Sequence, residues 1–589
     1  MYQEFTKRKN LLTIAMLLCF CAFTNKVMGQ TWDISDKSTT GNSVTAVLNG
    51  NTLTISGTGN MADFDVSAGG IPWNNYLTQI KTVIINSGVT NIGNIAFQGC
   101  SNLQTITIPS TVTIIGYRAF YNCTNPNLQI IIPNSVTEIE GEAFRNCNLS
   151  MLRLENGSEQ LKFIGYSYQY GLYTYDWFKN CQIKTLHLGR NYISDLSYPP
   201  FRGISALQTL IIGNTVTFID YNYAFADCTS LTNVTIEDGS STLNLNGMNI
   251  FDQSPIKTLY LGRNYSADWG GTSAAPFYSK TSLISLTIGS YVTSIIDNAF
   301  YGCSGLTAIT IPNSVTSIGS SAFNGCIVLS AATIGSNVKT IGASAFNQCS
   351  ALISITIPKS VTSIDNSAFA NCTSLTNVTI EDGSSTLNLN GMNIFNQSPI
   401  KTLYLGRNYS AQWGGTSAAP FYSKTSLTSL TIGSYVTSII DNAFYGCSGL
   451  TQITSKNPSP PIIGNGYYKA FDGVNKTTCK LYVPDGAVND YKAAFEWKEF
   501  FNILPTAIAP IKAYNIKIFP NPVKDELIIE NGNLDRENEK IQIIDFSGRI
   551  VISSQFSPSG SQLKINVSHL PSGVYILRIG SYTSKFVKE

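Results

Sequence analysis

Leu306-Thr-Ala-Ile-Thr-Ile-Pro-Asn-Ser-Val-Thr-Ser-Ile-Gly319, followed shortly by Ala322-Phe-Asn-Gly-Cys326, is the stretch of sequence that decides the fold. Its closing phrase recurs along the chain, so that Cys303, Cys326, Cys349 and Cys372 lie 23 residues apart. Self-similarity at a period of about 20 to 29 residues indicates a solenoid of stacked coils. Because one coil cannot bury its apolar face alone, each must pack on its neighbours. The sequence therefore predicts a mainly β solenoid.

Within one unit, Leu306, Ile309 and Ile311 are expected to point inward, and their closing period-2 spacing indicates a strand rather than a helix. Pro312 has no backbone N–H and is expected to end that strand. The apolar triplet recurs about sixteen times, which predicts about sixteen coils. The triplets begin at Ile80, Leu103, Leu128, Leu149, Ile183, Leu207, Leu231, Ile256, Leu283, Leu306, Leu329, Leu352, Leu375, Ile400, Leu427 and Leu450.

The rest of the chain divides around this array. A solenoid has two open ends that must be capped, and both flanks look suited to the task. The N-terminal flank holds hairpin-like pieces around Asn49-Gly50, and the C-terminal flank ends in an expected helix from Val488 to Phe501. The predicted boundaries are 1–29 for a signal peptide, 30–79 for an N-terminal capping module, 80–455 for the solenoid, 456–505 for a C-terminal cap, 506–514 for a linker and 515–589 for a small β-sandwich.

The N-terminus is typical of a secretory signal peptide. Lys7, Arg8 and Lys9 precede an apolar run from Leu11 to Phe23, and the small residue Gly29 follows. The apolar run is too short to span a bilayer comfortably, although a retained anchor is the alternative. No other stretch is apolar enough to cross a membrane, so the mature chain is expected to be soluble once it is exported.

Composition favours a neutral surface protein. The 589 residues carry only 13% charged side chains and a net charge of +2. Because no basic stretch could follow a phosphate backbone, nucleic acid is a poor candidate partner.

Eleven cysteines follow the apolar N-terminal run, and most share one repeat position. Parallel side chains on stacked coils suit disulfide bridging badly, so we expect buried free thiols, with disulfides as the alternative. No CxxC pair and no neighbouring histidine supports a metal site, and no cofactor is predicted.

Units such as Leu306–Gly319 with Ala322–Cys326 resemble the BspA-like leucine-rich repeats of bacterial surface proteins. Trp32, Leu53–Gly59 and Pro72-Trp73 resemble the N-terminal module of that family. Leu481–Gly486 and Trp497 are similar to its C-terminal cap. The resemblance implies a leucine-rich-repeat solenoid linked to adhesion and host-surface binding. It carries no fixed ligand residues.

The last 75 residues lack the repeat and show short strands separated by Gly and Pro turns, as in a small β-sandwich. They resemble the type A C-terminal sorting domain of the type IX secretion system of Bacteroidetes, with an ordinary accessory sandwich as the alternative. The resemblance implies passage through the type IX translocon, removal of the tail, and surface attachment or release. The residues that match its motifs are Pro520, Asn521, Pro522, Asp545, Gly548, Gly573, Tyr575, Lys585 and Lys588.

Catalytic groups are scarce. His187 and His569 are the only histidines and fall in different predicted domains, so they cannot share a triad. Glu237-Asp238 and its copy Glu381-Asp382 put adjacent carboxylates in a turn without a cleft. We interpret both as structural turns, and we predict no catalytic and no metal-binding residue.

Residues 229–307 recur at 373–451 with three differences, Asp252/Asn396, Asp268/Gln412 and Ile284/Thr428. An insertion rich in tyrosine also lengthens the interval between Leu149 and Ile183. Because Tyr and Trp are enriched in interfaces, aromatic residues in these places are the candidate ligand contacts, with packing of each loop on its own coil as the alternative. They are Tyr166, Tyr168, Tyr170, Tyr173, Tyr175, Trp177, Tyr260, Trp269, Tyr404 and Trp413.

One outward strand position is often threonine. Such a column could meet a regular ligand, but threonine also simply favours strands. The residues concerned are Thr107, Thr235, Thr287, Thr310, Thr333, Thr356, Thr379 and Thr431.

These observations predict a secreted or outer-membrane surface protein that acts as an adhesin or binding scaffold for a host or environmental protein or glycan. The alternatives are a self-associating structural component of the cell surface or matrix and, less well supported, a polymer hydrolase.

Overall fold

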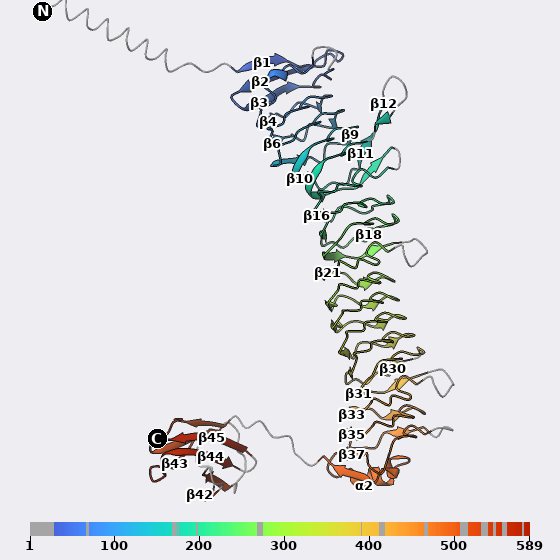
Figure 1. The fold of residues 1–589 in the computed structure, drawn as a ribbon, viewed down its shortest axis with the longest axis vertical. Coiled ribbons are helices and arrows are strands. Elements are labelled where there is room, and N and C mark those ends of the chain that lie inside the picture. Colours follow the sequence, from blue (N-terminus) through green and yellow to red (C-terminus); the bar gives the residue numbers. More distant parts are fainter. Residues whose placement is uncertain are drawn as a thin grey trace, which may run out of the picture. The chain divides into compact units, whose positions relative to one another are not determined.

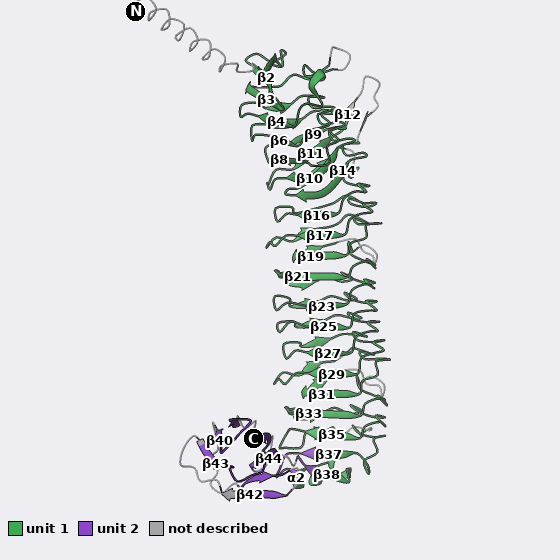
Figure 2. Cartoon of the chain, turned by 60° about the vertical axis from the view of Figure 1, so that its left-hand side comes forward, with its two compact units in different colours: residues 1–481, 489–502 green, residues 482–488, 503–589 purple. Residues whose placement is uncertain are grey.

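The computed structural model describes residues 29–65, 70–167, 173–174, 176–195, 198–267, 275–389, 391–411, 419–464, 469–506, 516–531, 540–545, 549–555, 562–579 and 582–589. The predicted signal peptide therefore lies outside the described residues except for Gly29. Two compact units make up the chain (Figure 2). The first takes in residues up to Leu481 together with Asn489–Asn502, and the second takes in Tyr482–Val488 and Ile503–Glu589.

The first unit is a stack of coils, and each coil contributes one strand to a parallel row (Figure 1). The predicted triplets supply these strands, which confirms the coil register. The row consists of β4 (Thr82–Ile85), β6 (Thr105–Thr107), β8 (Leu128–Ile132), β10 (Asn148–Leu154), β14 (Gln182–Leu188), β16 (Thr209–Ile212), β17 (Asn233–Ile236), β19 (Thr258–Arg263), β21 (Ser285–Tyr291), β23 (Ala308–Thr310), β25 (Ala331–Thr333), β27 (Ser354–Ile357), β29 (Asn377–Ile380), β31 (Thr402–Arg407), β33 (Ser429–Tyr435) and β35 (Gln452–Ser455).

A second row of shorter strands follows the turn after the first. It consists of β5 (Asn91–Ile92), β7 (Ile114–Ile115), β9 (Glu138–Glu140), β11 (Leu161–Ile164), β15 (Tyr192–Ser194), β18 (Leu243–Asn244), β20 (Tyr265–Ser266), β22 (Ser294–Ile295), β24 (Ser317–Ile318), β26 (Thr340–Ile341), β28 (Ser363–Ile364), β30 (Leu387–Asn388), β32 (Tyr409–Ser410), β34 (Ser438–Ile439) and β36 (Ile462–Ile463). A hairpin, β12 (Tyr166–Ser167) with β13 (Tyr173–Thr174), projects from the coil that holds β11.

A phenylalanine ladder runs through the interior of the stack. Every coil places the Phe of its closing phrase on the Phe of the coil before, with ring centroids 5.2 to 6.1 Å apart. All of these rings are buried, and their near-parallel stacking adds to the apolar area that each removes from water. The ladder consists of Phe97, Phe120, Phe144, Phe178, Phe201, Phe225, Phe251, Phe277, Phe300, Phe323, Phe346, Phe369, Phe395, Phe421, Phe444 and Phe471.

The cysteines lie three residues after the ladder phenylalanines in most coils, and all eleven from Cys100 to Cys479 are free and buried, which confirms the expectation of free thiols. The thiol of Cys326, for example, donates to the carbonyl of Phe300 in the preceding coil at 3.4 Å. Burial raises the pKa of Cys303 to about 12, so the group stays a neutral thiol. The cysteine column is therefore structural.

The N-terminal end is closed by antiparallel strands. β1 (Gln30–Asp33), β2 (Ser43–Asn49) and β3 (Thr52–Thr58) form a meander, and β3 pairs in parallel with β4. After the 3-10 turn η2 (Asn74–Tyr76), the chain enters the coils. Trp73 is fully buried against Phe97, and its indole Nε1 donates to the carbonyl of Ala96 at 3.1 Å. Trp73 thus covers the first ring of the phenylalanine ladder.

The C-terminal end is closed by β37 (Lys480–Val483), α2 (Val488–Ala493), η4 (Trp497–Glu499) and β38 (Asn502–Pro505). The expected single helix from Val488 to Phe501 was wrong, because Glu496 adopts a left-handed conformation with φ of 62°. That turn brings the Glu496 carboxylate to the backbone N–H groups of Ala470 and Phe471, at 3.1 and 2.6 Å. In earlier coils the backbone N–H of the ladder phenylalanine donates to a backbone carbonyl of the next coil, as that of Phe444 does to the carbonyl of Ala470. Glu496 therefore takes the place of a missing coil.

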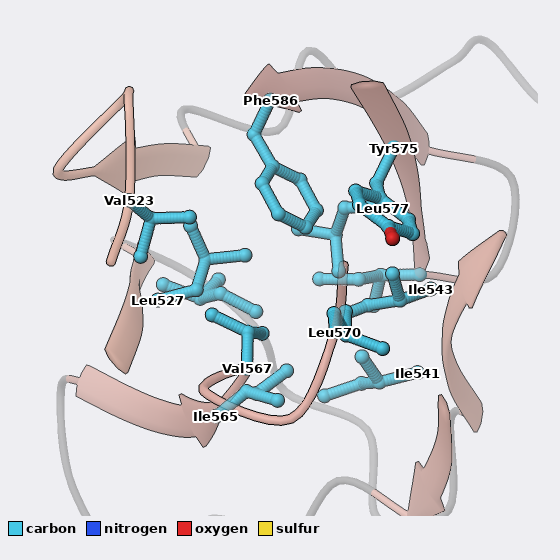
Figure 3. Close-up of a cluster of buried hydrophobic side chains, with 12 residues drawn as sticks. Val523, Leu527, Ile541, Ile543, Ile565, Val567, Leu570, Tyr575, Leu577 and Phe586 are labelled. Atoms are coloured by element: carbon cyan, nitrogen blue, oxygen red, sulfur yellow. The ribbon is translucent and has the colours of Figure 1, made fainter. Parts of the chain in front are cut away.

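The second unit contains the predicted small β-sandwich. One sheet holds β39 (Ile516–Phe519), β40 (Glu526–Asn531) and β43 (Gln562–Asn566), and the other holds β42 (Ile550–Gln555), β41 (Lys540–Ile544), β44 (Gly573–Ile579) and β45 (Tyr582–Lys588). Leu527 and Leu577 are fully buried in the apolar core between the sheets (Figure 3).

Candidate binding surface

The outward side of the first strand row, which we call the strand face, is a set of columns fixed by the parallel register. The central column places Thr235, Tyr260 and Thr287 on successive strands. The duplicated block repeats this with Thr379, Tyr404 and Thr431. The register places the predicted threonines on the strand face and confirms their outward position.

Tyr260 is tethered rather than free on the strand face. Its hydroxyl donates to Asp238 Oδ1 at 2.7 Å, and Asp238 belongs to the turn that follows β17 in the preceding coil. This hydrogen bond to the carboxylate raises the pKa of Tyr260, with burial a lesser cause. A half-buried tyrosine held at both ends is a rigid platform, because little conformational entropy remains to be lost on binding.

Tyr404 repeats this arrangement in the second copy. Its hydroxyl lies 2.9 and 2.8 Å from the two carboxylate oxygens of Asp382. In addition, the Lys456 ammonium lies 4.8 Å from the ring centroid of Tyr404 in a cation–π contact. Burial, followed by the Asp382 hydrogen bond, raises the pKa of Tyr404 to about 12. The two tyrosines therefore share one tether and differ in what lies over the ring.

Glycine makes room for the carboxylate in both copies. A Cβ atom at Gly289 would lie 2.8 Å from Asp238 Oδ1 and 3.0 Å from the Tyr260 hydroxyl. The same atom at Gly433 would approach Asp382 Oδ1 even more closely. A side chain at either position would displace the tyrosine–aspartate pair.

Buried arginines hold the turns that lie next to this surface. Arg263 is fully buried and donates to the carbonyls of Asn214 and Gly213, both at 2.8 Å, two coils before its own. Arg407 does the same for Lys359 and Pro358, at 2.8 and 3.0 Å. Burial lowers the pKa of both arginines.

Sequence reasoning missed this role. The signal that could have found it is Leu-Gly-Arg-Asn-Tyr, which occurs at 188–192, 261–265 and 405–409. At the first of these, Arg190 donates to the carbonyls of Asn134 and Pro133.

Comparison with known protein families agrees with this architecture. The chain matches the family described as BspA type leucine rich repeat region, in six copies, over residues 75–172, 174–267, 273–402 and 417–514. These stretches cover more than half of the chain. The chain is a BspA-type leucine-rich-repeat protein.

Solved structures similar to this BspA-type protein come from several bacteria. A leucine-rich repeat protein from Bacteroides ovatus ATCC 8483 has 22% identity, with 78% of this chain and 98% of that chain covered and a TM-score of 0.30. One from Eubacterium ventriosum ATCC 27560 has 23% identity, with 58% and 95% covered and a TM-score of 0.25. The pneumococcal vaccine antigen PcpA has 14% identity, with 82% and 100% covered and a TM-score of 0.21. No curated protein matches the chain.

The tail of this BspA-type protein matches the secretion system C-terminal sorting domain over residues 517–589. The protein is therefore exported by the type IX system and is found at the cell surface or released. Among the described residues, no helix is long and apolar enough to span a membrane.

Several of the predicted sorting-motif residues have structural contacts in the sandwich. Asn521, between Pro520 and Pro522, accepts a hydrogen bond from the backbone of Val587 at 2.9 Å. Asp545 accepts one from the backbone of Arg549 at 3.0 Å.

The remaining motif residues lie in or near the last two strands. The Tyr575 hydroxyl donates to the carbonyl of Pro571 at 2.9 Å. Gly573 pairs with Lys588, and Lys585 with Ile576, between β44 and β45. Gly548 lies outside the described residues.

Only some of the other aromatic candidates lie among the described residues. Tyr168, Tyr170, Tyr175, Trp269 and Trp413 lie outside the described residues. Tyr166 and Tyr173 belong to the hairpin of β12 and β13.

Trp177 is a correction. Its side chain is only 1% exposed, packs edge-on against Phe163 and donates from Nε1 to the carbonyl of Ile164 at 3.1 Å. A residue buried in this way packs its own coil and cannot contact a ligand at the surface. The alternative, a loop aromatic that packs inward, is correct for Trp177.

The acidic pair Glu237-Asp238 is divided between two partners. Asp238 is held by Tyr260, whereas Glu237 Oε1 lies 3.5 Å from Nε2 of His187. Burial lowers the pKa of His187. Each carboxylate therefore has a contact within the strand face or its adjacent turn.

Proposed function

We propose that this surface protein is a binding scaffold that docks a macromolecular partner, a protein or a glycan, on its strand face. The observation that carries the proposal is the duplicated tyrosine–aspartate pair, Tyr260 with Asp238 and Tyr404 with Asp382. Tyrosine is among the residues that dominate binding energy, and a ring fixed before binding costs little entropy to immobilise.

The spacing of the pairs supports binding at two points. Strands β19 and β31 are six coils apart. At about 4.8 Å per coil, the two rings would be separated by roughly 29 Å along the stack. A partner that reaches both rings converts the second contact into an intramolecular one and gains avidity without any new kind of contact. The threonines of the central column between the rings are small, so they offer little steric hindrance to a partner that reaches both rings.

A binding role is favoured over a catalytic one because the carboxylates of the two acidic turns, 237–238 and 381–382, are held in contacts of their own. Asp238 and Asp382 are engaged by tyrosines, and Glu237 lies beside His187. Repeat scaffolds of this family present an extended surface, which suits recognition better than the closed site that acid–base chemistry needs.

The test uses the full chain and measures its binding to immobilised matrix proteins and to mucin glycans. Tyr260→Ala and Tyr404→Ala are each expected to weaken binding by about tenfold or more, as loss of an interface hot spot does. The double variant is expected to lose more than either single variant. Thr310→Ala and Thr333→Ala, on the same column between the two tyrosines, are matched controls and should leave binding unchanged.

Two results would overturn the proposal. One is a double tyrosine variant that binds as the unmodified chain does. The other is an unmodified chain that binds none of the probes and only associates with itself in sedimentation, which would favour the structural-component alternative.

A further inference from the structure

A polar pocket lies away from the strand face, where the closing turns of two successive coils meet. It has a volume of about 530 Å³, within the range of small-molecule sites, and it lies between the turn after β30 and the turn after β32. Its lining includes Asn393, Asn396, Gln397, Tyr422, Lys424 and Ser426.

Lys424 occupies the place that cysteine takes in most coils, three residues after the ladder phenylalanine Phe421. Its ammonium donates to the carbonyl of Phe395 in the preceding coil. In the cysteine coils a thiol makes the equivalent contact, as Cys447 does with Phe421. The position that a buried cysteine takes in most coils is therefore occupied here by a lysine, which also lines the pocket.

The first copy of the duplicated block supplies a natural comparison. Lys280 stands where Lys424 does and donates to the carbonyl of Phe251 at 2.5 Å. The lining positions are the same in both copies except one, which is Asp252 in the first copy and Asn396 in the second. Gln253 donates from Nε2 to Asp252 at 3.4 Å, whereas Gln397 has no recorded side-chain hydrogen bond among the described residues.

The single difference changes the charge around the lysine. Burial lowers the pKa of both lysines, but Asp252 opposes that effect at Lys280. At Lys424 the pKa falls to about 8, and the neighbouring ionisable group is the Cys447 thiol, whose pKa is about 11. Among the described residues neither lysine has a carboxylate within ion-pair distance, but Asp252 is near enough to Lys280 to act on it electrostatically, and no carboxylate acts on Lys424 in this way. Lys424 is a mostly protonated amine at neutral pH, so an anion in the pocket would supply the counter-charge.

The rest of the lining suits a polyol. Amides and hydroxyls are the groups that hydrogen-bond sugar hydroxyls, and Tyr422 adds an aromatic ring. That ring is fixed by stacking on Tyr445, with centroids 5.2 Å apart and planes within 1°. One cation matches one carboxylate, whereas phosphate binding typically calls for several donors or cations.

We propose that the pocket at Lys424 binds a sugar acid, with the ammonium facing the carboxylate and the side-chain amides of Asn393, Asn396 and Gln397 facing the hydroxyls. At the equivalent place beside Lys280, the carboxylate of Asp252 would repel such a ligand. This site is separate from the strand face and stands whether or not that face binds a macromolecule.

The experiment titrates the full chain with D-glucuronic acid and with N-acetylneuraminic acid, followed by ligand-observed NMR. D-glucose and acetate are the matched control probes, because glucose carries the hydroxyls without the carboxylate and acetate carries the carboxylate without the hydroxyls. Sialyllactose and lactose then distinguish a free sugar acid from one at the end of a glycan.

Three variants make the test specific. Lys424→Cys restores the residue of the cysteine coils, so the fold is kept while the charge is lost, and binding is expected to disappear. Asn396→Asp is expected to weaken binding by about tenfold or more through charge repulsion. Asp252→Asn is expected to create a second site and to raise the stoichiometry from one to two.

The expected result is binding of at least one sugar acid at one equivalent, lost in Lys424→Cys while the circular dichroism spectrum is unchanged. Binding of the acid by Lys424→Cys as tightly as by the unmodified chain would overturn the proposal. So would equal binding of glucose, or no binding of either acid at millimolar concentration.

Discussion

The duplicated blocks, residues 229–307 and 373–451, show how much of this molecule is set within a coil and how much by its neighbours. Their internal contacts repeat almost atom for atom: Arg263 donates to Ser241 Oγ at 3.2 Å, and Arg407 donates to Ser385 Oγ at 3.3 Å. Their surfaces differ where another coil or a single substitution intervenes. Lys456, which lies over Tyr404, belongs to the coil after the second block, and the corresponding residue after the first block is Pro312. The repeated sequence therefore gives the same packed interior in both blocks but different surfaces.

The largest effect on this comparison should come from the phenylalanine ladder. Phe251→Ala and Phe395→Ala each remove a buried ring that stacks on both sides, and each is expected to destabilise its region by about 3–5 kcal/mol. Because repeat arrays need not unfold in one step, hydrogen exchange of the affected coil and its neighbours is the suitable measurement.

The two phenylalanine variants should lower the free energy of unfolding by the same amount within experimental error, since each ring stacks on a ladder phenylalanine on either side. Thr310→Ala, on an exposed strand position, is the control and should change protection little. A clear difference between the two variants would show that coils beyond the duplicated blocks set the stability of each packed interior.

The sequence predicted the packed interior of the coils well because the pattern of buried residues is local and periodic. The inward positions of the triplets and the cysteine column follow from spacing, and the hairpin around Gly50 follows from its Asn-Gly turn. The Leu-Gly-Arg-Asn-Tyr motif marks the arginines, but their partners were not predictable, since Arg263 bonds carbonyls about 50 residues earlier and only the stacking offset brings them together. Trp177 was placed wrongly because composition marks a loop as aromatic but does not say which ring turns inward.

The buried arginines give the next largest effect. Arg263→Met or Arg407→Met keeps most of the side-chain volume but leaves two buried carbonyls without their donor. Because removal of a buried charge offsets part of that loss, each variant is expected to destabilise by about 2–4 kcal/mol. Hydrogen exchange of the turns at 213–214 and 358–359 should report the change.

Lys257→Met, an exposed position in the coil of Arg263, serves as the matched control and should leave those turns protected. If either arginine variant were as stable as the unmodified chain, the guanidinium would not be what holds the turns. Unequal losses of stability would instead point to Asn214 and Lys359, the corresponding acceptor residues, which lie before the two blocks and differ from each other.

The smallest effect concerns the pKa values of the two tyrosines and separates the hydrogen bond to aspartate from burial as their cause. Both have a raised pKa, but the hydrogen bond to Asp238 is the first cause at Tyr260, whereas burial is the first cause at Tyr404. Asp238→Asn should therefore return the pKa of Tyr260 close to its ordinary value of 10.0, and Asp382→Asn should lower that of Tyr404 from about 12 only in part. NMR titration of labelled tyrosine measures both.

A raised phenol pKa stabilises the fold below pH 10, and at Tyr404 this contribution is lost as the pH rises towards 12. An equal response of the two tyrosines to loss of their aspartates would contradict this prediction, because burial would then contribute no more to the pKa of Tyr404 than to that of Tyr260.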